Sequence, residues 1–365
     1  MRIDADFVAK KLGKNIGNII IAQRDDEGNI YCENLIGAVV IPLGIAGPLR
    51  INGDHINGDY YVPLATTEGA LVASVNRGCK VISLSGGVNV SLNRIGTTRG
   101  PVFYVNSLKE ADKFETWLQT NEKKIAKVIE QTSSHLKFIK LETKNVGNYI
   151  YVRLYFNTDQ AMGMNMATIA TQKFADYVAL ETKTKCLTIA GNYDIDKKPS
   201  WLNFISGRGF QGWGEIIIKE KIINEILKTT SRKIFDVWLA KCMIGSAMSG
   251  SMGFNAHFAN IIAAFYVATG QDLAHVVEGS MGISSTKVLG NNDLYFSVYL
   301  PALMLGMVGG GTKLRTQTEA REIIGVNKIE QLVEVLVGAI LAGELSLLAS
   351  LAEGSLAKVH EKLGR

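Results

Sequence analysis

Cysteine and histidine are scarce in this chain. The four cysteines, Cys32, Cys79, Cys186 and Cys242, lie far apart and form no CxxC pair. This spacing excludes a disulfide framework and the usual zinc sites, and it predicts free thiols in a reducing compartment. The five histidines form no HxH or HExxH pattern. We therefore predict that the protein binds no metal ion.

Long apolar runs and a strong excess of one charge are also missing. Segment 332–351 is the most apolar, but Glu334 and Glu344 interrupt it, which favours a buried helix over a membrane span. The N-terminal segment is charged from its second residue and has no secretory apolar core. The net charge of +5, from 39 basic and 34 acidic residues, is mild and spread out. We expect a cytoplasmic protein with an anionic small ligand and without membrane or nucleic-acid partners.

Residues 101–189 show a readable order of elements. Extended and helical patterns follow the order β-α-β-β-α-β, which is the ferredoxin-like arrangement. The segment lies between Gly100-Pro101 and Gly191, so we expect an inserted module. Such modules also bind RNA, but the aromatic run that RNA binding requires is absent. The expected strands are 102–105, 136–142, 149–156 and 185–190, and the expected helices are 108–131 and 161–182.

The flanking segments 31–100 and 191–345 are glycine-rich and apolar. Hydrophobic residues make up 47% of the whole chain, which is ample material for a core. We expect an α+β fold in which a large mixed helix/sheet domain is interrupted by the smaller module. The long amphipathic segment 326–360 is expected to hold two helices.

Two adjacent lysines follow the module. Lys197 and Lys198 stand between Asp196 and Pro199, at the end of segment 191–199. Neighbouring ammonium groups repel each other, and a carboxylate at Asp196 can offset one of them. The arrangement suits a site that meets negative charge in a bound substrate or in a transition state. The alternative interpretation is a solvated basic turn.

Glu68 and segment 159–166 each have one functional and one structural interpretation. A carboxyl group in an apolar neighbourhood, as at Glu68, can act as a general acid. The alternative is a helix capping box with Thr66 or Thr67 as the cap. In segment 159–166, small residues at a helix start would let a phosphate or ribose approach backbone N–H groups. Taken alone, a capped helix whose methionines fill the core is the simpler interpretation.

The segment Gly207–Gly212 matches the pattern GxGxxG. The residues after it read as a strand, whereas a dinucleotide-binding fingerprint opens a helix. We therefore interpret it as a glycine-rich turn and exclude a Rossmann site.

Eleven segments, in this order along the chain, resemble the 3-hydroxy-3-methylglutaryl-CoA (HMG-CoA) reductase family. Within this family, the chain most resembles the soluble catalytic domain of the class I branch, because residues 66–69 have the Thr-Thr-Glu-Gly form of that branch. The resemblance implies a large substrate domain interrupted by a ferredoxin-like, non-Rossmann cofactor domain. The segments are 33–37, 41–48, 65–69, 76–78, 98–101, 161–165, 191–199, 255–257, 270–272, 309–312 and 343–346.

The resemblance implies a two-step reduction of HMG-CoA to mevalonate and CoA with NADPH, NADH being possible. Each hydride transfer places negative charge on a carbonyl oxygen, and the loss of a group that stabilises such charge costs roughly 2.7–4 kcal/mol. By resemblance Lys197 is that group, Glu68 supplies the proton and Asp272 tunes both by its charge. His360 would protonate the CoA thiolate from a tail that closes over the site.

The resemblance also implies binding residues, domains and an assembly. The domains would be 1–100 with 190–345, the insert 101–189, and a C-terminal helix and mobile tail at 346–365. HMG-CoA and mevalonate would be the ligands, and a homodimer or higher homo-oligomer would share its active sites. The implied substrate-binding residues are Ser74, Arg99, Asn192, Lys198, Lys241 and Asn260. The implied cofactor-binding residues are Asp159, Gln160, Met162, Gly163, Met164, Asn165, Gly309, Gly310 and Gly311.

Two positions depart from the family pattern. Gln160 precedes Ala161 where an aspartate is usual, and Ala190 precedes Gly191 where a serine is usual. Both bear on cofactor affinity and on the choice between NADPH and NADH. The change at Gln160 also motivates an alternative, a CoA- or nucleotide-binding protein on the same scaffold with lost or altered catalysis.

Overall fold

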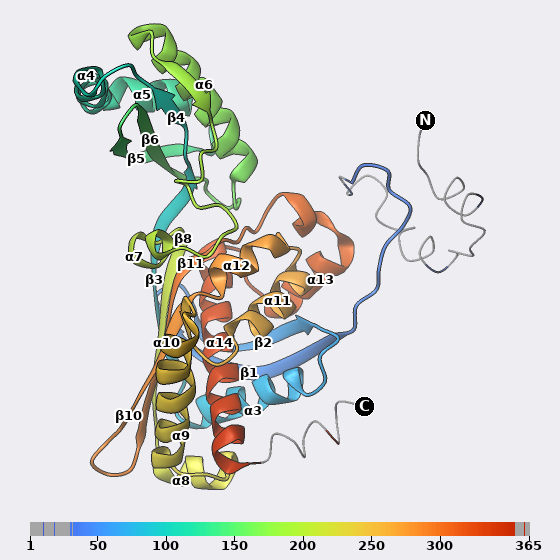
Figure 1. The fold of residues 1–365 in the computed structure, drawn as a ribbon. Coiled ribbons are helices and arrows are strands. Elements are labelled where there is room, and N and C mark those ends of the chain that lie inside the picture. The colour runs from blue at the N-terminus through green and yellow to red at the C-terminus, as the bar shows by residue number, and fades with distance from the viewer. Residues whose placement is uncertain (1–9, 11–17, 19–29, 31, 355–360, 362–365) are drawn as a thin grey trace.

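One mixed sheet runs through both parts of the molecule (Figure 1). The computed structural model describes residues 10, 18, 30, 32–354 and 361. The strand order is β7-β4-β6-β3-β8-β11-β10-β9, with β5 beside β6 and β1 joining β2 to β3. The strands are β1 Leu43–Gly53, β2 Asn57–Ala65, β3 Val88–Arg99, β4 Val102–Tyr104, β5 Lys137–Val146, β6 Tyr149–Asn157, β7 Lys185–Thr188, β8 Gly209–Ile218, β9 Gly253–Phe254, β10 Gly282–Val288 and β11 Leu294–Leu303.

The helices pack on this sheet in two groups, so the protein has a mixed α/β fold. The α-helices are α3 Leu71–Leu84, α4 Leu108–Thr120, α5 Glu122–Glu130, α6 Met164–Thr182, α7 Trp201–Ser206, α8 Glu220–Ile222, α9 Ser231–Trp238, α10 Ser246–Ser249, α11 Phe258–Thr269, α12 Val276–Gly279, α13 Arg315–Ile324 and α14 Ile329–Glu353. The π- and 3₁₀-helical turns are η1 Ile223–Leu227, η2 Leu239–Gly245, η3 Leu273–His275 and η4 Gly310–Lys313.

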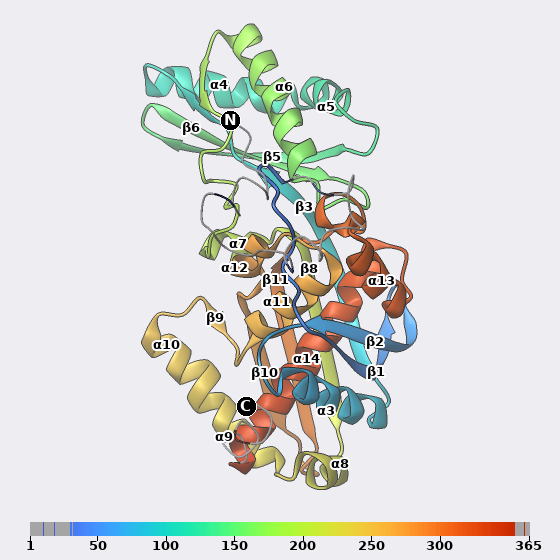
Figure 2. The ribbon, with the colours of Figure 1, turned by 90° about the vertical axis from the view of Figure 1, so that its right-hand side faces the viewer.

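The smaller part, at the top of Figure 2, has its own hydrophobic core. Its strands pair antiparallel in the order β7-β4-β6-β5, and the element order expected from the sequence is present. The single helix expected at 108–131 is instead two, because Asn121 leaves helical geometry and bonds back to a helix carbonyl. The next helix starts at Met164 rather than at 161, because Gly163 takes a left-handed conformation with φ 88°.

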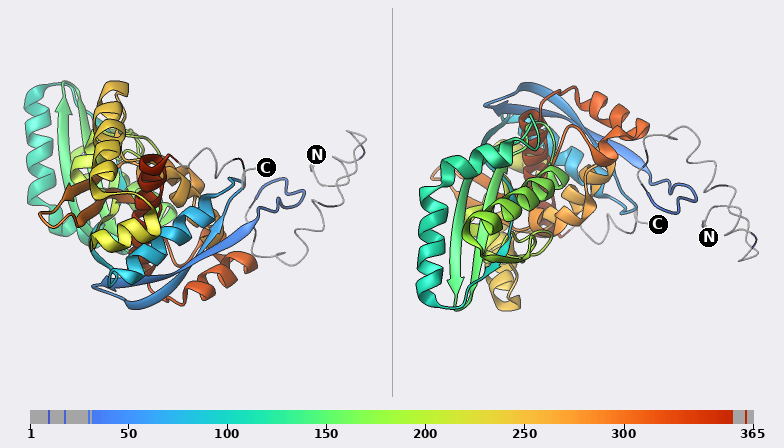
Figure 3. Two further views of the ribbon diagram at one scale, coloured as in Figure 1. Left: turned by 90° about the horizontal axis from the view of Figure 1, so that it is seen from below. Right: turned by 90° about the horizontal axis from the view of Figure 1, so that it is seen from above.

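The helix α14 forms the axis of the larger part and contacts α3, α9, α11 and strands β1, β3, β8 and β11 (Figure 3). Segment 326–360 was expected to hold two helices, but Ile329–Glu353 form one continuous helix, so that expectation is wrong for this stretch. Residue 346, expected to open a separate C-terminal helix, lies inside α14. This helix is long and apolar enough to cross a membrane, but 83% of its most apolar window is buried. It is the core helix of the fold.

Two glutamates inside α14 accept hydrogen bonds from backbone donors. Glu334 accepts two from the turn between β1 and β2, each 3.0 Å long. Glu344 accepts from the N–H groups of Ala256, at 2.8 Å, and His257, at 2.6 Å. Because their oxygens are satisfied, these carboxyl groups do not break the buried helix.

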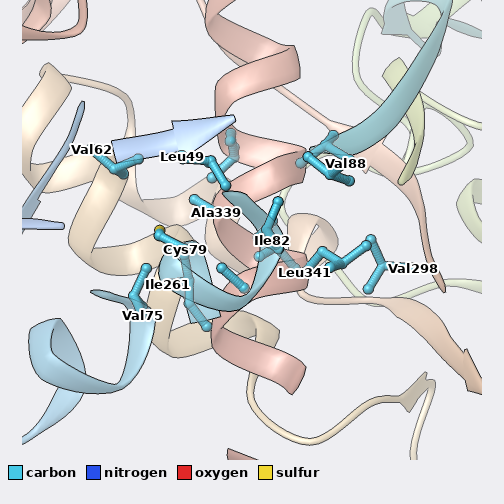
Figure 4. Close-up of a cluster of buried hydrophobic side chains, with 14 of the residues drawn as sticks. Leu49, Val62, Val75, Cys79, Ile82, Val88, Ile261, Val298, Ala339 and Leu341 are labelled. Carbon is cyan, nitrogen blue, oxygen red and sulfur yellow. The ribbon is translucent and has the colours of Figure 1, made fainter. Parts of the chain in front are cut away.

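Close approach of α3 to α14 builds the centre of the large core (Figure 4). Cys79 and Ile82 of α3 and Ala339 of α14 are fully buried there. A Cβ atom on Gly78 would lie only 2.0 Å from the carbonyl oxygen of Ala342. Glycine at this position therefore sets the distance between the two helices.

Candidate active site

The segment that carries the two lysines is a strained loop between β7 and α7, where the two parts of the molecule meet (Figure 1). Asn192, Ile195 and Lys197 all have positive φ, at 63°, 51° and 57°. Thr98 donates to the Asp194 carbonyl at 2.8 Å, and a side-chain amide from α7 donates to the Ile195 carbonyl at 2.9 Å. Such conformations persist only where the surroundings impose them, and they gather at functional sites.

Lys197 forms an ion pair with Asp272, with 2.8 Å between Nζ and Oδ2. The two side chains are 38% and 36% exposed, so a ligand can reach them. Asp272 also caps η3 by accepting the Ala274 N–H at 3.1 Å. Burial raises the pKa of Asp272, but the bonds from Lys197 and Ala274 and the charges of His275 and Lys197 outweigh it, so that this pKa is lowered. A solvated basic turn does not explain such a pair.

Asp196 does not offset either lysine, and that expectation is wrong. Its carboxylate lies 3.1 Å from Arg208 and 3.6 Å from Arg99. Lys198 is exposed, and its Nζ donates to the Asp196 backbone carbonyl at 3.4 Å within the part of the chain that the structure describes. The two lysines therefore differ, because Lys197 pairs with a carboxylate that is distant in sequence, whereas Lys198 is exposed.

Behind the ion pair lies a buried group of charged side chains that the sequence did not single out. Arg208 is fully buried and contacts the carboxylates of Asp196 and Glu278. His275 is fully buried and lies between Glu278 and Asp272. Arg208 belongs to segment 207–212, where the expected glycine-rich turn is wrong beyond Arg208, because residues 209–212 open strand β8.

Three of these side chains lie close enough together to hold a metal ion. Oxygen and nitrogen atoms of Asp196, His275 and Glu278 lie within 4.8 Å of one another. The Arg208 guanidinium, however, bonds to both carboxylates and supplies the positive charge between them. The geometry therefore favours an arginine-centred cluster over a divalent cation.

Glu68 is held from outside its own segment. Asn260 of α11 donates to its Oε1 at 3.1 Å. Thr66 accepts the Glu68 N–H at 2.9 Å, but α3 begins only at Leu71 and has no side-chain cap. The capping-box interpretation is therefore wrong, and the Glu68 carboxylate is available for other contacts.

A cavity of about 790 Å³ lies beside Asn260. It is also lined by Lys241, His257 and Pro199, the residue next to Lys198. Burial lowers the pKa of His257 to about 4, so its imidazole stays neutral near pH 7. An ammonium group, neutral polar groups and a neighbouring basic loop suit an anionic ligand.

The other predicted substrate residues lie elsewhere. Ser74 is bonded to Ser346 of α14 at 3.0 Å and does not line this cavity. Arg99 lies beneath the lysine loop and contacts the carboxylate of Asp194, at 3.2 Å. Asn192 is exposed on the loop itself. His360 lies outside the residues that the structure describes.

The two predicted cofactor segments lie side by side. Ala161 and Val308 form a parallel bridge, and the Gln160 carbonyl accepts the Met307 N–H at 2.8 Å. The Gln160 side chain in turn accepts the N–H of Ile329, the first residue of α14, at 2.8 Å. Asp159 points instead to the exposed His135, at 3.2 Å.

Glycines shape this region. Gly309 and Gly310 have φ of 89° and 54° and open space where a Cβ would stand. Met162 and Gly163 precede α6, and Met164 and Asn165 form its first turn. A Cβ on Gly270, two residues before Asp272, would lie 2.3 Å from the Gly311 carbonyl oxygen. The backbone of Gly311 therefore packs directly against Gly270, close in sequence to the Asp272 of the ion pair.

Comparisons with known proteins identify the family of this chain. A family model described as hydroxymethylglutaryl-coenzyme A reductase matches residues 3–365. The chain is 48% identical to the 3-hydroxy-3-methylglutaryl-coenzyme A reductase of Methanocaldococcus jannaschii, covering 98% of this chain and 91% of that protein. It is 45% identical to that of Methanothermobacter thermautotrophicus, covering 100% and 93%.

Solved structures share the fold. The class II 3-hydroxy-3-methylglutaryl-CoA reductase from Streptococcus pneumoniae bound to NADPH superposes with a TM-score of 0.74 at 17% identity, covering 94% of this chain and 82% of that one. The fold and these relatives define an NAD(P)H-dependent oxidoreductase. More closely, the chain belongs to the HMG-CoA reductase family, in its archaeal class I branch, and has the reductase activity of the mevalonate pathway.

Proposed function

We propose that Lys197, Asp272 and Glu68 are the catalytic groups of this reductase. The observation that carries the proposal is the 2.8 Å ion pair between Lys197 and Asp272 on a strained, accessible loop. An ammonium group held in advance needs no reorganisation when negative charge develops on a carbonyl oxygen.

The chemistry assigns one role to each group. NADPH supplies the hydride in both reductions. Lys197 stabilises the oxyanion as the thioester becomes a hemithioacetal, and again as the aldehyde becomes the alcohol mevalonate. Glu68 gives the proton that this oxygen takes up. Between the two reductions the hemithioacetal hydroxyl returns its proton to Glu68 as the carbon–sulfur bond breaks, and His360 gives its proton to the departing CoA thiolate.

The substrate occupies the cavity beside α11. Lys241 provides positive charge in the cavity for the carboxylate of HMG-CoA, and Asn260 provides an amide donor. Lys198 and Asn192 are exposed on the adjoining loop and reach the substrate from there. Asn260 lines this cavity and bonds to Glu68, which supports a proton donor close to the cavity. Arg99 supports the lysine loop from beneath through its ion pairs with Asp194 and Asp196, and Ser74, which bonds to Ser346, is given no contact with the cavity.

NADPH is the cofactor, held by a ferredoxin-like domain of residues 101–189 together with the glycines at 309–311. The open space at Gly309 and Gly310 fits the close approach of a phosphate or ribose to backbone N–H groups. The adjoining segment supplies Asp159, Gln160, Met162, Gly163, Met164 and Asn165. The structural relative in Streptococcus pneumoniae is bound to NADPH.

The remaining features of the proposal concern the compartment, the assembly and the ligands. The enzyme works in the cytoplasm, where four free thiols suit a reducing compartment. It forms a homodimer or higher oligomer in which neighbouring chains complete one another's sites. HMG-CoA and mevalonate are its small-molecule ligands. No metal takes part in the proposed steps.

The deciding experiment compares two lysine variants with the same backbone conformation. Lys197→Gln should lower kcat for HMG-CoA-dependent NADPH oxidation by about 10²–10³-fold, as the loss of an oxyanion-stabilising donor does elsewhere. Lys228→Gln is the matched control, since Lys228 also has a φ of 57° and is exposed far from the site. Near-normal turnover of a folded Lys197→Gln protein would refute the assignment.

A further inference from the structure

The Lys197–Asp272 pair is the outer end of a continuous row of charged side chains. From Asp272 the row passes inward to His275, then to Glu278 and Arg208. The structure leaves Arg208, His275 and Glu278 fully buried. The row therefore joins an accessible ion pair to groups that bulk water does not reach.

His275 is the link between the two ends. Its Nδ1 lies 2.9 Å from Glu278 and 4.0 Å from Asp196, while its Nε2 lies 3.6 Å from the Asp272 carboxylate. Among the described residues, Nε2 has no hydrogen-bond partner. An unpartnered nitrogen of a buried imidazole thus faces the carboxylate that holds Lys197.

The charges around His275 come from several elements. Arg208, at the start of β8, approaches Nδ1 at 3.5 Å and also bonds Thr98. Tyr266 of α11 is fully buried, and burial and the charge of Glu278 raise its pKa, so its hydroxyl stays neutral. Without His275 the row holds more acidic than basic groups. The acidic groups are Asp194, Asp196, Asp272 and Glu278, and the basic ones are Arg99, Lys197 and Arg208.

We propose that His275 is a positioning residue for the reduction, which fixes the Asp272 carboxylate against Lys197 and couples this pair to the buried Glu278–Arg208 pair. The proposal rests on the catalytic roles assigned above to Lys197 and Asp272. Asp272 is one-third exposed, and His275 is the side chain that approaches it from the protein interior. Nε2 faces Oδ2 of Asp272, the oxygen that also contacts Lys197, so an N–H at Nε2 would restrain this carboxylate from turning toward water.

The test is the pH profile of kcat in His275→Gln. A glutamine can reach Asp272 but cannot carry a charge, and the charge of His275 is one of the causes that lower the pKa of Asp272. Its loss should raise that pKa, so the Lys197–Asp272 pair would break at a higher pH. We expect kcat to fall about tenfold and its acid limb to move up by about one pH unit, while KM for HMG-CoA changes less than about twofold.

Glu278→Gln is the second variant, because it keeps the His275 imidazole beside Asp272 but removes the carboxylate that contacts its Nδ1. A smaller shift of the acid limb in the same direction supports the proposal. If His275→Gln does not fold, this variant decides alone, and an unshifted profile overturns the proposal. An unshifted profile in His275→Gln does so too, even if kcat falls. Lys197→Gln separates the positioning role of His275 from the catalytic role of Lys197, because its activity tests the catalytic role alone.

Discussion

The buried carboxyl group of Glu344 should make the stability of this enzyme fall as the pH rises. Burial, opposed by the N–H groups of Ala256 and His257, raises its pKa from 4.5 to about 7. The folded state therefore binds this proton more tightly than the unfolded state does. The stability from this group is fully present below the unfolded pKa and is lost as the pH rises through the folded one.

The size of the effect follows from the shift. At 1.36 kcal/mol per pKa unit, the contribution of Glu344 to the free energy of unfolding should fall by about 2–3 kcal/mol between about pH 5 and about pH 8. Glu344→Gln carries no titrating proton, and its amide oxygen can still accept from Ala256 and His257. The variant should therefore lack this part of the pH dependence, although it loses the stronger bonds that a carboxylate accepts.

The assay is urea unfolding of both proteins at several pH values and one protein concentration. The free energy of unfolding of the natural protein minus that of Glu344→Gln should fall by about 2–3 kcal/mol from about pH 5 to about pH 8. Taking the difference cancels other titrating groups such as His257. A difference that stays constant, or that rises with pH, would refute the reasoning.

Two further substitutions probe the core and the site. Gly78→Ala should lower the free energy of unfolding by about 3 kcal/mol or more, because its Cβ would overlap the Ala342 carbonyl, whereas Gly290→Ala, with open space around it, should change it by less than about 0.5 kcal/mol. Equal urea midpoints for the two variants would contradict this packing. Asn260→Ala should lower kcat/KM about tenfold, since it removes the bond that orients Glu68. Unchanged steady-state kinetics would show that Glu68 is oriented in another way.

Local patterns predicted the smaller part well, because each of its elements has its own period and turn. The hairpin of β5 and β6 and the helix α6 are present near the expected bounds. The misplaced boundaries have local causes, namely the break at Asn121 and the left-handed Gly163. Segment 326–360 was expected to hold two helices because of its length, but it forms the single helix α14 as far as Glu353. The two glutamates inside this helix bond to backbone donors that are distant in sequence.

The candidate site was found less completely. Resemblance pointed to Glu68, Lys197 and Asp272, but adjacency in sequence suggested Asp196 as the partner of a lysine. In the folded chain Asp196 is bound to Arg208 and Arg99 instead. Ser74, expected at the substrate, bonds to α14 and lies apart from the cavity.

The amino-acid sequence alone determined the family, the alternation of strands and helices, and the glycines that permit left-handed turns. These depend on residue type and on neighbours a few positions away. Only the tertiary structure decided that Lys197 pairs with Asp272 and that His275 stands between this pair and Arg208. Charges interact through space, with a strength set by distance and burial. Residues 75 positions apart, as Lys197 and Asp272 are, meet only once the whole fold has formed.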